Sequence, residues 1–263
     1  MNTPTNNAYL EAAMPSLSAM QTITLDEMKN IHLMDRVDSK FVTNIALLPY
    51  LLEEMLPYFK VQITNNSSVA PYATQYFDTP DLGMFLMHHN GKLNRQKIRI
   101  RSYIDSNLSF LEIKNKNNKG RTSKKRIRVQ ASHIDSIDDL KEDKNFLNEN
   151  SLFSSDSLVP VLANNFNRMT FVNTKATERI TIDVNLSFQN YITGNKSVLE
   201  NLMILELKQD GLQHSDFREI LSRLRIRSSS FSKYCMGTFL TNANVKSNRM
   251  KGKWAKVSKL LDK

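Results

Sequence analysis

The chain has 263 residues, of which 36 are Lys or Arg and 26 are Asp or Glu, so its formal net charge is +10. Hydrophobic residues make up 40% of the sequence, which is enough to fill a core and excludes a chain that is disordered throughout. The single cysteine, Cys235, excludes an intramolecular disulfide framework and a zinc site built on several thiolates. We therefore expect a folded globular protein in a reducing compartment.

No secretory signal is predicted, because the first 12 residues lack a basic segment followed by an apolar one. The longest apolar candidate for a membrane span, residues 45–59, is interrupted by two prolines and two glutamates. We expect a cytoplasmic protein, and leave a peripheral position at a membrane open. The excess of positive charge indicates an anionic partner, which could be nucleic acid, an acidic membrane or a phosphate-rich small molecule.

In chain order, residues 1–22 are polar and weakly patterned, and we interpret them as a flexible N-terminal arm before a short helix capped by Thr24. An amphipathic helix is predicted from Asn44, with Pro49 in its first turn and an apolar face that extends to Phe59. A second helix follows residues 79–81 and ends at residues 90–91. Further helices are predicted at residues 135–150, 155–163, 214–226 and 229–243. We place a single domain at residues 23–244 and a basic C-terminal tail at residues 245–263.

Between these helices the hydrophobic period changes to two, which is typical of strands. The predicted strands are residues 34–42, 61–64, 72–78, 94–103, 108–116, 122–130, 164–172, 179–188 and 203–209. A polar turn at residues 114–120 favours an antiparallel hairpin between two of them, residues 108–116 and 122–130.

The polar face of these strands is unusually basic. Residues 95, 97, 99 and 101 are all Arg or Lys, and they alternate with Ile98 and Ile100. Because side chains on a strand alternate between its two faces, the four cations share one side of the sheet. The same pattern recurs on five other predicted strands, where the few carboxylates (Asp38, Glu112, Asp183 and Glu206) fall on the basic face.

About eight antiparallel strands can close into a barrel, and the predicted helices could cover an apolar exterior. The prediction is an α+β fold: an eight-stranded antiparallel β-barrel, or tunnel, with a charged interior and a helical cover. Buried cations are costly without partners, and a polyphosphate would supply them. Carboxylates on the same face could hold a divalent cation. Double-stranded nucleic acid would not fit such a lumen, and we predict no nucleic-acid partner.

At these residues the sequence resembles the triphosphate tunnel metalloenzymes (the CYTH-like superfamily), and within them the polyphosphate polymerase domain of the vacuolar transporter chaperone (VTC) type. The resemblance rests on the order and spacing of short blocks between residues 34 and 236. These are DRVDSKF (35–41), YFDT (76–79), KIRIR (97–101), LEIK (111–114), FNR (166–168), ERITID (178–183), LELK (205–208) and FSKY (231–234).

The resemblance implies an enzyme that binds ATP, requires Mn²⁺ or Mg²⁺, and transfers the γ-phosphoryl group to a growing polyphosphate chain. Carried over by position, the phosphate ligands with a catalytic role would be Lys40, Arg99, Arg101, Lys114 and Lys208. Further phosphate ligands would be Lys124, Arg126, Arg168, Arg179 and Lys233. Glu206 would be the metal carboxylate, with Glu112 and Asp183 as secondary metal or pairing candidates. A separately encoded membrane protein is a further candidate partner.

Two positions depart from the family pattern. Arg36 replaces the first glutamate of the Glu-x-Glu-x-Lys strand that is common in the hydrolytic members, which weakens metal binding from this strand. Phe166 replaces a tyrosine and removes one hydroxyl that could contact phosphate. Two alternatives therefore stay open beside the polymerase: a hydrolase of triphosphate or nucleoside triphosphate, and a non-catalytic polyphosphate sensor. The oligomeric state is not predicted.

Overall fold

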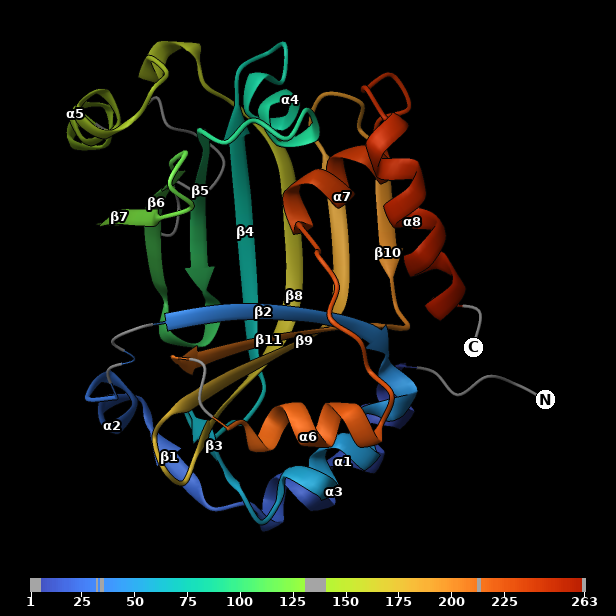
Figure 1. Cartoon of the computed structure of the whole chain (residues 1–263). Coiled ribbons are helices and arrows are strands. Elements are labelled where there is room, and N and C mark those ends of the chain that lie inside the picture. The colour runs from blue at the N-terminus through green and yellow to red at the C-terminus, as the bar shows by residue number, and fades with distance from the viewer. Residues whose placement is uncertain (1–5, 32, 34–35, 131–140, 212–213, 262–263) are drawn as a thin grey trace.

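The computed structural model of the chain describes residues 6–31, 33, 36–130, 141–211 and 214–261. Its centre is a strongly curved antiparallel sheet of eight strands in the order β2-β11-β9-β8-β4-β5-β6-β7 (Figure 1). The eight strands are β2 (Arg36–Asn44), β4 (Ala70–Asp78), β5 (Arg95–Tyr103), β6 (Leu108–Lys116), β7 (Thr122–Val129), β8 (Val159–Asn173), β9 (Glu178–Asn190) and β11 (Leu202–Asp210).

Three short strands extend this sheet. β1 (Thr22–Thr24) pairs in parallel with β3 (Phe59–Ile63), which itself joins β8, and β10 (Lys196–Leu199) pairs with β9. Among the described residues no ladder joins the two end strands, β2 and β7. The sheet is therefore a barrel-like tunnel wall whose last seam is not closed by backbone pairing, and the prediction of an α+β tunnel fold is confirmed.

Helices cover the sheet in separate groups (Figure 1). At one end lie α1 (Asn6–Ala19), α2 (Leu25–Lys29), α3 (Leu48–Met55) and α6 (Asp216–Arg223). At the other lie α4 (Gly83–His89), α5 (Lys141–Asn150), α7 (Lys233–Thr241) and α8 (Asn248–Leu261). No helix in the described part of the chain is long and apolar enough to cross a membrane.

The apolar faces of the strands are buried against these helices. Ile180, Ile182 and Leu205 of β9 and β11 pack with residues of α3 and α6. Ile98, Ile100 and Leu111 of β5 and β6 pack with Met84 of α4 and Leu147 of α5. Because these residues alternate with the basic ones, burial of one face turns the charged face inward.

The inner face changes character along the strands. On β11, Glu206 and Lys208 share a face with Ile204, and on β8 Arg168 shares a face with Phe166. Ile204 and Phe166 belong to an apolar cluster with Tyr234 and Met236 of α7. Helix α7 therefore packs on the same face as the cations and fills one end of the tunnel.

Several predicted elements differ in the structure. Residues 155–163 do not form one helix: a single 3-10 turn, η4 (Ser155–Ser157), is followed by the start of β8, because Val159 and Val161 extend the strand. The helix from Asn44 begins as η1 (Ile45–Leu47) and ends at Met55, so Phe59 lies in β3. The short strands β1 and β10 were not predicted, and residues 131–140 lie outside the described residues.

The predicted N-terminal arm is also different. Residues 6–19 form helix α1, and its residues Ala13 and Leu17 are buried in the same cluster as α3. Small and apolar residues at helical spacing explain this packing, which the polar composition of the segment obscured. The short helix behind it is confirmed: Thr24 caps α2, accepting from Glu27 N at 3.2 Å while Glu27 Oε2 accepts from Thr24 N at 2.8 Å.

Candidate active site

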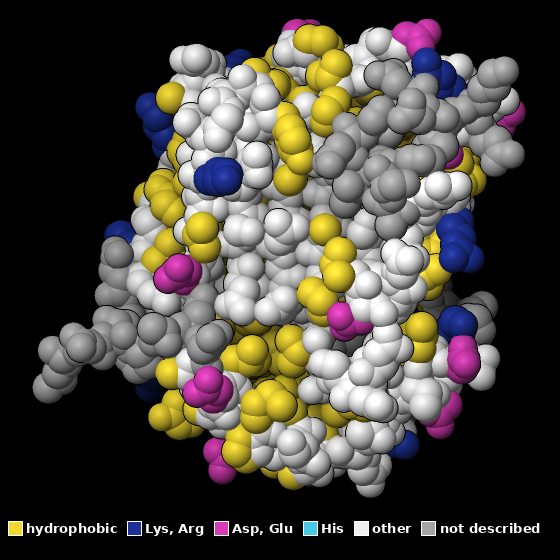
Figure 2. Space-filling model, turned by 180° about the vertical axis from the view of Figure 1, so that it is seen from behind, with side chains coloured by type: hydrophobic (Ala, Val, Ile, Leu, Met, Phe, Trp, Pro, Cys, Tyr) yellow, Lys and Arg dark blue, Asp and Glu magenta, His cyan; other side chains and the backbone are white. Residues whose placement is uncertain are grey.

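Many of the basic side chains predicted to bind phosphate lie on the inner face of the sheet. Seen from behind, the middle of the molecule carries mainly uncharged side chains and backbone, with Lys and Arg only scattered near its edges (Figure 2). On the inner face, the predicted cations gather around three carboxylates: Glu112 on β6, Asp183 on β9 and Glu206 on β11. This arrangement offsets the cost of holding so many like charges together.

Glu112 holds two cations from the neighbouring strands. Arg99 Nη2 on β5 lies 2.7 Å from its carboxylate, and Lys124 on β7 forms a second ion pair with it. The Glu112 side chain is only 1% exposed. Burial alone would raise its pKa, but Arg99, Arg101 and Lys124 outweigh burial and lower the pKa of Glu112 to about 2. Glu112 is therefore a fixed anion that orients Arg99 and Lys124.

Asp183 joins the sheet to helix α7. Arg168, its register partner on β8, donates two hydrogen bonds to the carboxylate at 2.6 and 2.7 Å. Lys233, the first residue of α7, forms an ion pair with the same carboxylate. Although burial opposes ionisation, Arg168 and Lys233 hold the pKa of Asp183 below its ordinary value. Burial also lowers the pKa of Lys233 to about 7, against the opposing effect of Asp183.

Glu206 is the most exposed of the three carboxylates, with 18% of its side chain accessible. Lys40, its register partner on β2, places Nζ at 2.8 Å. Burial opposes ionisation here too, but Lys40 and Lys208 keep the pKa of Glu206 below its ordinary value. Lys114 of β6 interacts electrostatically with Glu206, which connects this group to the opposite wall.

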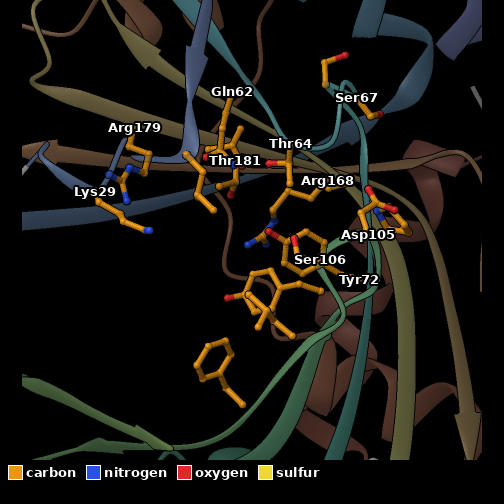
Figure 3. A pocket seen from close by; sticks show the side chains of 18 of the residues that line it. Lys29, Gln62, Thr64, Ser67, Tyr72, Asp105, Ser106, Arg168, Arg179 and Thr181 are labelled. Atoms are coloured by element: carbon orange, nitrogen blue, oxygen red, sulfur yellow. Dashed lines mark hydrogen bonds between the residues drawn. The ribbon is translucent and has the colours of Figure 1, made fainter. Parts of the chain in front are cut away.

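A cavity of about 480 Å³ opens beside these pairs (Figure 3). Four of the predicted phosphate ligands line it: Arg126, Arg168, Arg179 and Lys208. Arg179 is tethered at the wall, because its Nη2 donates to the Met28 carbonyl of α2 at 2.8 Å. Arg101 lies deeper, where burial, Arg99 and Arg168 lower its pKa to about 10. The structure thus places these four residues at one cavity, while the other predicted site residues lie in or next to the ion-pair groups of Glu112, Asp183 and Glu206.

The aromatic lining of this cavity was missed by the sequence reasoning. Tyr72 and Phe166 stack with ring centroids 5.3 Å apart, Tyr103 lies 4.9 Å from Tyr72, and Phe110 lies 5.9 Å from Tyr103. Arg126 lies 4.6 Å from the Phe110 ring centroid. The alternation of side chains along the strands could have predicted this lining. Tyr103 is two residues beyond Arg101, and Phe110 is two residues before Glu112, so each ring is expected on the same face as its charged neighbour.

A second missed feature holds α7 in place. The fully buried Asp78 accepts hydrogen bonds from Met84 N and Phe85 N of α4, both at 2.8 Å, and from the hydroxyl of Tyr234. Burial raises the pKa of Asp78, while these donors oppose the rise. The Tyr234 ring also stacks on Tyr76, at a centroid distance of 5.1 Å. Asp78 and Tyr234 therefore hold the helix that carries Lys233.

The residues fit a divalent cation only in part. The described residues contain no group of three or more His, Cys, Asp or Glu side chains that could hold a metal ion. Glu112 and Asp183 are each engaged by two basic side chains, which favours pairing over metal binding. Glu206, the most accessible of the three carboxylates, could hold a cation only together with ligands from elsewhere, such as the oxygens of a phosphate chain.

Fold and inner surface together define a class of architecture: an antiparallel, tunnel-like sheet with charged side chains on its inner face. The fold resembles that of a "putative adenylate cyclase" from Bacillus halodurans, with a TM-score of 0.51 at 14% identity, covering 76% of this chain and 96% of that one. HpAC1 from Hippeastrum, described as having a dominant triphosphatase activity, gives a TM-score of 0.46 at 12% identity, covering 78% and 96% of the two chains. Comparison with curated proteins finds no match.

Within this class the family is clear. The model of the VTC domain matches residues 35–242, which is most of the chain. The chain therefore belongs to the VTC domain family, and the resemblance inferred from its short sequence blocks is confirmed. The family supports a function that involves triphosphate or polyphosphate.

Proposed function

We propose that this protein is a metal-dependent polyphosphate polymerase, which transfers the γ-phosphoryl group of ATP to a growing polyphosphate chain inside the tunnel. One observation carries the proposal: the inner face presents lysines and arginines from seven strands and α7, and Glu112, Asp183 and Glu206 hold several of them in place. Such a surface suits a long, highly charged anion better than a single phosphate group.

In the proposed reaction, a terminal phosphate oxygen of the chain attacks the γ-phosphorus of ATP. A new P–O bond forms, the bond from the γ-phosphorus to the β,γ-bridging oxygen breaks, and ADP leaves with the electron pair. Arg99 and Arg168, held by Glu112 and Asp183, would orient the phosphates and neutralise charge in the transition state. No side-chain nucleophile is needed, because positioning and charge neutralisation carry this chemistry.

A divalent cation, Mn²⁺ or Mg²⁺, would be held by Glu206 and phosphate oxygens, and would supply further neutralisation of charge. Glu206→Ala tests this assignment. The variant should keep its fold, because Glu206 is partly exposed, but should lose metal-dependent turnover. Unchanged turnover would place the metal elsewhere.

The polymerase is tested directly by incubating the purified protein with ATP and Mn²⁺ and separating the products on a gel stained for long anionic chains. ADP and free phosphate are measured in parallel. Chains that appear with ADP support the polymerase. Free phosphate without chains would instead indicate a triphosphatase, and bound but intact ATP would indicate a polyphosphate sensor.

A further inference from the structure

The cavity has two chemically different ends (Figure 3). Lys29 and Arg179 lie on one side of the view, Ser67 and Asp105 on the other, and Arg168 and Tyr72 between them. Of the described residues that line the cavity, Asp105 alone is acidic. A phosphate chain would be attracted to the cationic end and repelled by the carboxylate at the other.

The end near Asp105 carries an aromatic wall. Tyr72, Tyr103 and Phe110 come from three neighbouring strands, line the cavity and are only partly buried, so part of each ring is accessible. Ser106 and Thr64 place hydroxyl groups close by. Arg126 also lies at this wall, with its guanidinium carbon 4.6 Å from the Phe110 ring centroid. Accessible rings beside hydroxyl groups suit a planar heteroaromatic base and a sugar, and a bare phosphate chain would leave the rings unused.

The two ends meet at Arg168. Its guanidinium carbon lies 5.1 Å from the centroid of the Tyr72 ring, while its Nε and Nη2 bind Asp183 on the charged side. A ligand that spans this junction would place its phosphates toward Lys208 and Arg179, and its uncharged part against Tyr72 and Tyr103. A nucleoside triphosphate has this division, and the cavity of about 480 Å³ is in the range of small-molecule sites.

We propose that the Tyr72–Tyr103–Phe110 wall, with Asp105 and Ser106 at its edge, binds the nucleoside of a nucleoside triphosphate. The inference rests on the proposed function in one respect, because the tunnel must bind the triphosphate. It adds that the protein distinguishes ATP from inorganic tripolyphosphate, and that uncharged side chains of β4, β5 and β6 make the distinction.

Isothermal titration calorimetry with ATP and with tripolyphosphate, both without divalent cation to prevent turnover, tests the proposal. Tyr103→Leu removes the ring but keeps an apolar side chain, and Tyr103→Phe keeps the ring and removes only the hydroxyl. Stacking of a base on an aromatic ring predicts that Tyr103→Leu weakens ATP binding roughly 5- to 100-fold. Tripolyphosphate binding should be unchanged in both variants, and ATP binding unchanged in Tyr103→Phe.

Tyr50→Leu is the matched control, because Tyr50 is 61% exposed on α3 and does not line the cavity. Equal affinity of the wild-type protein for ATP and tripolyphosphate would overturn the proposal, as would an equal loss for both ligands in Tyr103→Leu. In either case triphosphate binding in the tunnel would stand. If the wild-type protein binds neither ligand, with or without divalent cation, the proposed function itself fails.

Discussion

The Glu112→Gln variant tests two properties of the charged interior: how much its ion pairs contribute to stability, and how strongly its cations bind an anionic ligand. The carboxylate of Glu112 is 1% exposed and is contacted by Arg99 and Lys124, so a neutral isostere leaves two cations without their anion. The pKa of Glu112 is lowered from 4.5 to about 2. At about 1.4 kcal/mol for each pKa unit, the carboxylate contributes roughly 3 kcal/mol to the free energy of unfolding at neutral pH.

The stability loss has a defined pH dependence. A carboxylate with a lowered folded-state pKa stabilises the fold above its unfolded-state pKa, and this contribution is lost as the pH falls through the folded-state value. Urea unfolding of wild-type protein and Glu112→Gln should therefore differ by roughly 3 kcal/mol at pH 7, and the difference should shrink as the pH falls from 4.5 toward 2.

Tripolyphosphate should offset part of this loss of stability in the variant. In the wild-type tunnel Glu112 competes with phosphate for Arg99 and Lys124, and in the variant it does not. Added tripolyphosphate should therefore stabilise Glu112→Gln more than it stabilises the wild type. The matched control is Glu54→Gln, which removes a surface ion pair with Arg223 and should leave the urea midpoint and the response to tripolyphosphate nearly unchanged. A Glu112→Gln protein as stable as the wild type, or one that gains less from tripolyphosphate, would refute the reasoning.

Three further variants test other parts of the site. Because the pKa of Lys233 is about 7 and only its protonated form attracts phosphate, wild-type affinity for tripolyphosphate should fall with rising pH relative to Lys233→Met; a constant ratio from pH 6 to about 8 would contradict the assignment. Tyr234→Phe removes one donor to the buried Asp78 and should lower the free energy of unfolding by about 1–3 kcal/mol in urea, whereas Tyr50→Phe should have no effect. Arg99→Ala should weaken tripolyphosphate binding by about 1.5–3 kcal/mol, with a loss that shrinks at high salt; equal affinity in calorimetry would place Arg99 away from the ligand.

The alternation of charged and apolar residues by itself determines much of this fold. Strand β6 matches its predicted range, residues 108–116, and β5 and β7 differ from theirs by one residue. A period of two fixes which side chains share a face, and burial of isoleucine and leucine on one face leaves only the inner face for Arg99, Glu112 and Lys124. The local pattern is sufficient to predict the bounds and faces of these strands, because the face that is apolar in the sequence is also the face that is buried in the fold.

Other features depend on contacts between distant segments and were decided only by the tertiary structure. Asp78 and Tyr234 are 156 residues apart, and Lys233 and Asp183 are 50 apart, so no local pattern pairs them. The aromatic wall forms because strand register places Tyr72 of β4 opposite Tyr103 of β5, and Phe110 of β6 diagonally next to Tyr103. The hydrophobic period of the sequence predicts which face of a strand a side chain occupies. Which side chains contact one another on that face depends on strand register and on how the helices pack, and these are known only from the tertiary structure.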